Sequence, residues 1–218
     1  METEAKLAFK DKESLYALAR AEFFRELCSD PQEPGPVLLE NSYIDTADLD
    51  ISRRGGMIRV RHYSGRDEDR FEFTVKYGGS VTGGLHQRHE WNVQSTDGTF
   101  SVESFKRQAS ADAPGDMLSE VFGTVSDDEL NVICSNSFNR TVYNISFGQS
   151  SIEACFDSGI ISSSDGSRTD EICELELELM EGDIEDIRKL ADLIIDKTGC
   201  VPFEDTKYRR TLAIGTGD

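Results

Sequence analysis

The chain has 218 residues, of which 37% are hydrophobic, and a formal net charge of −19. This length suits one large domain or two small ones, and no segment approaches the roughly 20 apolar residues of a transmembrane helix. The negative charge opposes binding to nucleic acid and to acidic membrane surfaces. The chain opens on acids instead of a basic-then-apolar signal, so we expect a cytoplasmic protein with no nucleic-acid or membrane partner.

The cysteines are five in number and scattered, and none belongs to a Cys-x-x-Cys pair. An odd count without paired spacing argues against a disulfide framework and against a structural zinc site. We therefore expect reduced, mostly buried thiols.

The first segment alternates charged and apolar residues, which predicts a strand over residues 2–10. Successive side chains of a strand point to opposite faces, so Glu2, Glu4 and Lys6 share one face. Apolar residues at helical spacing predict a helix over 12–28. A proline-rich loop over 30–36 leads to a strand over 37–44, followed by a turn or short helix over 45–48.

The middle of the chain predicts three strands, over 57–63, 71–77 and 85–93. A hairpin turn over 64–67 joins the first two. Two glycine pairs between 78 and 84 indicate a mobile loop. Residues 100–122 have a helical pattern that breaks near 114–115.

The remaining elements are strands over 137–147, 151–157 and 172–180, a helix over 184–197 that ends at Gly199, and a closing segment over 207–214. About eight strands in neighbouring hairpins with few helices predict a single α+β domain over 1–218. Its expected core is an antiparallel, closed, eight-stranded β-barrel.

Charged residues occupy one face in the middle of nearly every predicted strand. For a single strand, a solvated face with cross-strand ion pairs explains this pattern. Its repetition over five or more strands favours a barrel with a charged, polar lumen and helices packed outside. Same-face carboxylates about 7 Å apart repel by about 2.4 kcal/mol at an effective dielectric of 20, so such a lumen needs Lys, Arg or a divalent metal.

Several segments, in this order and spacing, resemble the CYTH superfamily, the triphosphate tunnel metalloenzymes. These are Glu2-x-Glu4-x-Lys6, residues 41–49, 53–61 and 73–76, Arg88-His89-Glu90-Trp91, residues 153–157, and Glu174-Leu175-Glu176-Leu177-Glu178-Leu179. The resemblance covers nearly the whole chain and implies a tunnel that binds a triphosphate together with Mg²⁺ or Mn²⁺.

The resemblance also implies roles for individual residues. The metal-binding residues are expected to be Glu2, Glu4, Asp157, Glu174, Glu176 and Glu178. The substrate-binding residues are expected to be Lys6, Arg59, Arg61, Lys76, Arg88, Arg140 and Lys207. The catalytic residues are expected to be Lys6, Lys76 and Glu90. The first and last long strands should then meet around a metal ion.

The implied chemistry is metal-assisted hydrolysis of a terminal phosphoanhydride, without a covalent nucleophile. The first hypothesis for the substrate is inorganic tripolyphosphate. A thiamine triphosphatase, a class IV adenylate cyclase and a non-enzymatic polyphosphate- or nucleotide-binding protein are open alternatives. A small-molecule carrier would require an apolar lumen, and a homodimer is also open.

Overall fold

The computed structural model describes residues 1–30, 32–64, 70–109, 116–163 and 165–216. The strands are β1 (Glu2–Ala8), β2 (Val37–Asp45), β3 (Gly56–Ser64), β4 (Phe71–Thr82), β5 (Leu85–Ser95), β6 (Asn131–Phe147), β7 (Ser150–Ser162), β8 (Thr169–Glu181) and β9 (Val201–Pro202). The helices are α1 (Lys12–Arg20), α2 (Glu22–Arg25), α3 (Asp50–Arg53), α4 (Val102–Ala109), α5 (Met117–Phe122), α6 (Ile184–Thr198) and α7 (Lys207–Thr216).

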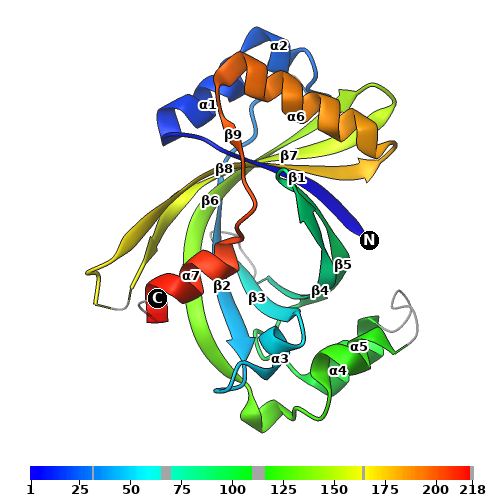
Figure 1. Ribbon diagram of the computed structural model, residues 1–218, viewed down its shortest axis with the longest axis vertical. Helices are drawn as coiled ribbons and strands as arrows, with labels where there is room; N and C mark the ends of the chain where they lie inside the picture. Colours follow the sequence, from blue (N-terminus) through cyan, green and yellow to red (C-terminus); the bar gives the residue numbers. More distant parts are fainter. Residues whose placement is uncertain (31, 65–69, 110–115, 164, 217–218) are drawn as a thin grey trace.

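Eight antiparallel strands close into a barrel, as the sequence predicts (Figure 1). Their order is β5-β4-β3-β2-β6-β7-β8-β1, and β1 pairs again with β5 to complete the ring, while the two-residue β9 adds to β1. The first and last long strands are neighbours, because Glu4 pairs with Glu178 and Lys6 with Glu176. The predicted meeting of these two acidic segments is therefore confirmed.

Helices cover the outer faces of the barrel and bury its outward apolar side chains. Helices α1, α2 and α6 lie over β1, β6, β7 and β8, where Leu15, Phe24 and Leu190 are fully buried. Helices α4 and α5 cover β3, β4 and β5 with Phe105 and Phe122. Each such side chain contributes roughly 2 kcal/mol by burial. Because the apolar side chains of the strands point outward to the helices, the alternate residues of every strand face inward.

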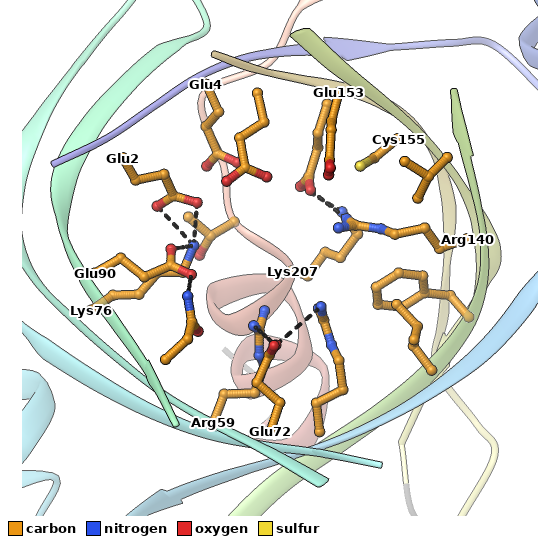
Figure 2. A pocket seen from close by; sticks show the side chains of 18 of the residues that line it. Glu2, Glu4, Arg59, Glu72, Lys76, Glu90, Arg140, Glu153, Cys155 and Lys207 are labelled. Carbon is orange, nitrogen blue, oxygen red and sulfur yellow. Dashed lines mark hydrogen bonds and ion pairs between the residues drawn. The ribbon is translucent and has the colours of Figure 1, made fainter. Parts of the chain in front are cut away.

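Helix α7 differs from the other helices because it lies across one end of the barrel (Figures 1 and 2). The Tyr208 hydroxyl lies 2.5 Å from Ser52 Oγ, and Asn136 Nδ2 donates to Thr211 Oγ1 at 2.8 Å. Helices packed outside the barrel are thus only part of the architecture. The C-terminal helix brings side chains into the lumen from one end.

Two local expectations are wrong. The helix predicted over 12–28 is interrupted at Ala21, whose extended backbone (φ −66°, ψ 135°) ends α1 and precedes α2. The expected mobile loop at the glycine pairs is instead the end of β4 and a tight turn into β5. At Gly84 (φ +80°) a Cβ atom would lie 2.8 Å from the Lys6 carbonyl oxygen, so close packing requires glycine there.

Other boundaries shift outward, since β6 begins at Asn131 and β7 continues to Ser162. The centre of the predicted hairpin turn over 64–67 and the break near 114–115 lie outside the described residues.

All five cysteines are free thiols. Within the described ranges, no helix has the length and apolar character needed to cross a membrane.

Candidate active site in the barrel lumen

The barrel encloses a cavity of about 450 Å³ that is lined from all eight strands and from α7 (Figure 2). Of the residues that the structure describes, seven with basic side chains line it: Lys6, Arg59, Arg61, Lys76, Arg88, Arg140 and Lys207. Seven carboxylates from the described ranges line it as well: Glu2, Glu4, Glu72, Glu90, Glu153, Glu176 and Glu178. This lumen is polar, contrary to the apolar interior that a carrier barrel would need.

The side chains of the two acids of β1 are both largely buried but differ in their surroundings. Lys76 Nζ donates to both oxygens of Glu2 at 2.8 and 2.9 Å, and Arg88 donates to Glu2 and to Glu4 at 3.2 and 2.8 Å. Burial, together with neighbouring carboxylates, raises the pKa of Glu2 to about 8. Burial opposes ionisation of Glu4 too, but Lys6 and other cations outweigh it and lower the pKa of Glu4 to about 2.

The two acids of β8 that line the cavity, Glu176 and Glu178, also differ in their surroundings. Glu176 accepts from Arg140 at 2.5 Å and from Lys207 at 2.8 Å, and it lies 3.1 Å from Lys6 Nζ. These cations overcome the effect of burial and lower its pKa well below the usual range. The Glu178 carboxylate makes no hydrogen bond or ion pair with any described residue. Burial and the nearby Glu90 raise the pKa of Glu178 to about 7, so this carboxylate lacks a cation of its own.

Lys76 is held between two carboxylates, because its Nζ also lies 2.5 Å from Glu90 Oε2. Burial would raise the pKa of Glu90, but Lys76 reverses the effect and lowers it. An ammonium group held in this way is a fixed positive charge inside the lumen.

The arginines of β3 present donors to the cavity. Arg59 Nη2 donates to Thr74 Oγ1 at 2.8 Å and lies 3.4 Å from Glu72 Oε1, while its buried Nε has no hydrogen-bond partner among the described residues. Arg61 is buried and donates from Nε to Asn41 Oδ1 at 2.9 Å. Planar guanidinium groups with free donors match phosphate oxygens.

Twelve of the fourteen predicted site residues line the cavity, and two lie behind it. Asp157 is fully buried and accepts from Arg140 at 2.7 and 2.5 Å, and its Oδ2 lies 2.8 Å from Lys207 Nζ. Glu174 accepts from Lys207 at 2.8 Å and from Arg210. The oxygens of these two acids thus face basic side chains and not the open cavity.

Sequence reasoning assigned no role to several residues of the lumen. Glu72 and Glu153 line the cavity, and strand parity could have found them, since Glu72 shares a face with Lys76. Arg210 and Asn41 do not line the cavity, and only contacts between distant segments connect them to the site. No local pattern in the sequence marks such contacts.

The chemistry of the lumen fits a hard divalent cation. Among the described residues, no group of three Asp, Glu, His or Cys side chains is arranged to hold a metal ion. Mg²⁺ often binds through one or two carboxylates and completes its coordination with water and substrate phosphates. Glu2, Glu4 and Glu178 offer hard oxygen donors, and the Glu178 carboxylate has no cationic partner among the described residues.

Comparisons with known proteins agree with this geometry. An inorganic triphosphatase of Haemophilus influenzae is 28% identical over 172 residues, which cover 79% of this chain but 42% of that longer protein. The chain therefore spans less than half the length of this curated relative.

Two solved structures share the fold. HpAC1 from Hippeastrum, described as a candidate adenylyl cyclase with a dominant triphosphatase activity, is 17% identical with a TM-score of 0.67 and covers 99% of this chain and 97% of its own. The bh2851 protein of Bacillus halodurans, described as a candidate adenylate cyclase, is 18% identical with a TM-score of 0.55 and 96% coverage of both chains. At these identities the likeness bears on the fold alone. The CYTH domain family matches residues 1–211, and the chain belongs to this family.

Proposed function

We propose that this protein hydrolyses the terminal phosphoanhydride of a triphosphate, with inorganic tripolyphosphate as the first candidate and Mg²⁺ or Mn²⁺ as cofactor. The observation that carries the proposal is the convergence of seven basic side chains on one cavity beside the acids of β1 and β8. The inorganic triphosphatase relative supports it. We further propose that the protein acts in the cytoplasm on a free small molecule.

The basic residues would bind the polyanion and stabilise the transition state. Negative charge spreads over the phosphoryl oxygens during transfer, and prearranged cations stabilise it without further reorganisation. Lys76 is already fixed by Glu2 and Glu90, so it can present its charge at a defined place. Arg59 and Arg61 would bind phosphate oxygens through their planar donor groups.

Glu2, Glu4 and Glu178 are the proposed metal-binding residues, and Glu176 is a further candidate. An ion held there would act as a Lewis acid that polarises the phosphate oxygens. Asp157 and Glu174 are better suited to hold Arg140 and Lys207 in position, because they contact these cations and do not line the cavity.

An organic triphosphate is a second candidate, because one side of the cavity is apolar. Val37, Leu39 and Tyr63 line it together with Pro34. Such a wall can hold an organic ring beside the phosphates. Thiamine triphosphate and ATP therefore belong in the same assay as tripolyphosphate, and release of a cyclic nucleotide would indicate a cyclase.

The deciding experiment measures release of phosphate, pyrophosphate and cyclic nucleotide from the three substrates, with Mg²⁺, with Mn²⁺ and with a chelator. We expect metal-dependent phosphate release, fastest with tripolyphosphate. Lys76→Ala and Glu4→Gln should reduce turnover strongly while circular dichroism stays unchanged. Binding without metal-dependent turnover of any substrate would refute the enzyme and support a non-enzymatic binding protein.

A further inference from the structure

A buried chain of hydrogen bonds connects Arg61, which lines the lumen, to helix α7. Arg61 Nε donates to Asn41 Oδ1 at 2.9 Å, and Asn41 Nδ2 donates to Asn136 Oδ1 at 3.0 Å. Asn136 Nδ2 donates to Thr211 Oγ1 at 2.8 Å, and this hydroxyl donates to the Lys207 carbonyl oxygen at 2.6 Å. We call Asn41, Asn136 and Thr211 the asparagine bridge; all three are buried.

The bridge has a fixed direction. Each asparagine offers one acceptor oxygen and one donor nitrogen group. Because the Asn41 oxygen accepts from the positively charged Arg61, its nitrogen must face Asn136, whose own nitrogen must then face Thr211. Turning either amide around would bring two donors or two acceptors together in a buried place, which costs the desolvation of both groups. Arg61 thus fixes the orientation of both amides, and with it the direction of the hydrogen bond from Asn136 to Thr211 of α7.

The two asparagines do not line the cavity, so they act through other residues. Helix α7 has further anchors, including Arg210 on Glu174 and Tyr208 beside Ser52. Those anchors attach it to β8 and α3. The asparagine bridge instead connects α7 with the β3 side of the lumen, where Arg61 lies.

We propose that the asparagine bridge is a positioning element, which ties the placement of α7 and its Lys207 to that of Arg61. This proposal rests on the proposed function, because it assumes that Arg61 and Lys207 bind the same triphosphate. Lys207 and Arg61 come from separate parts of the chain and must hold a fixed relation to bind the same ligand. A rigid, buried connection between their segments supplies that relation.

Removing the bridge should loosen α7 without altering the groups that react. In Asn136→Ala, Asn41 Nδ2 and Thr211 Oγ1 lose their buried partner. Loss of a buried hydrogen bond changes an equilibrium about tenfold. We therefore expect backbone amide exchange in α7 to become about tenfold faster and KM to rise about tenfold. The kcat should change less than about twofold, because α7 is ordered again once substrate is bound.

Hydrogen–deuterium exchange of the unliganded protein tests the bridge directly. The variants are Asn136→Ala, Asn41→Ala and the control Asn139→Ala, which removes an exposed amide from the same strand. The side-chain hydrogen bonds of Asn41 go to Arg61 and Asn136 and not to α7, so faster α7 exchange in Asn41→Ala supports transmission through Asn136. Wild-type exchange of α7 in Asn41→Ala and Asn136→Ala would overturn the proposal.

A second pair of variants covers the case in which an asparagine variant fails to fold. Thr211→Val keeps the shape but removes the hydroxyl, and Thr211→Ser keeps the hydroxyl. We expect fast α7 exchange with valine and wild-type exchange with serine; equal exchange in both would refute a role for the hydroxyl. The exchange measurement needs no substrate. If the protein hydrolyses no triphosphate but shows this exchange pattern, the proposed function is refuted and the role of the asparagine bridge stands. If the variants change α7 exchange but leave KM unchanged, the link between the bridge and substrate binding is refuted.

Discussion

Replacing Glu178 with glutamine should stabilise the metal-free protein. Glu178 faces the lumen without a cationic partner among the described residues, and burial together with Glu90 and Glu4 raises its pKa to about 7. Its ordinary value is 4.5. Glutamine has nearly the same shape but carries no charge, so the substitution removes only the penalty of ionising this group in the folded protein.

The sign follows from proton linkage. Below about pH 4.5 the carboxyl is protonated in both the folded and the unfolded protein and contributes nothing. Between pH 4.5 and 7 the folded protein binds more protons than the unfolded chain, so stability falls as pH rises. Above pH 7 the penalty is complete. A shift from 4.5 to about 7 corresponds to at most about 3 kcal/mol.

Urea denaturation with a chelator, at about pH 5 and about pH 8, measures the effect. Glu178→Gln should exceed the wild-type free energy of unfolding by up to about 3 kcal/mol at the higher pH and by little at the lower pH. Glu181→Gln, which changes an exposed acid on the same strand, is the control. A glutamine variant less stable than the wild type at pH 8 would refute the reasoning.

Magnesium should remove most of this difference in stability. An ion that binds the folded protein at 100 times its Kd adds about 2.7 kcal/mol. The wild type should gain this stability at pH 8, while Glu178→Gln should gain much less because one of the proposed donors is neutral. Equal gains in both proteins would remove Glu178 from the metal site while leaving the pH argument intact.

Three further predictions concern the support of the site. Asp157→Asn should destabilise the fold by about 3 kcal/mol, measured by thermal unfolding, because it removes a fully buried charge that Arg140 and Lys207 share. An unchanged Tm would contradict this. Glu72→Gln should lower the KM for tripolyphosphate about threefold, since Glu72 competes for the β3 arginines; a higher KM would contradict that competition. Gly84→Ala should lose about 2 kcal/mol in urea denaturation, and more than Gly83→Ala, which also has a positive φ but open space around it.

The lumen was predictable because strand parity is a strict rule. Side chains at alternate positions must share a face, so the sequence alone assigns Glu2, Glu4 and Lys6 to one surface. The same rule placed Glu176 and Glu178, and the register of β1 against β8 confirms that these two sets are neighbours. Closure of the barrel explains why so many strands carry charge on one face.

The contributions of α7 were not predictable in the same way. No periodic pattern in the sequence distinguishes a helix at the end of a barrel, such as the one that carries Lys207 and Thr211, from a helix on its outer face. The position of α7 depends on partners more than 30 residues away. The glycine pairs gave a misleading signal for a related reason. Gly84 permits a tight turn against β1, and glycine in a turn and glycine in a mobile loop look alike in a sequence.

The balance of charge in the lumen resolves the conflict between an acidic protein and a polyanionic substrate. Among the described residues, seven basic and seven acidic side chains line the cavity, so this lining has no net formal charge and the net charge of −19 lies in the rest of the chain. A neutral lumen attracts a bare triphosphate weakly, because the acids of β1 and β8 repel it as the basic residues attract it. A divalent cation would change this balance, because it would offset the charge of nearby carboxylates and part of the phosphate charge. The acids therefore make binding of the polyanion conditional on the metal, so catalysis and affinity should both disappear with a chelator.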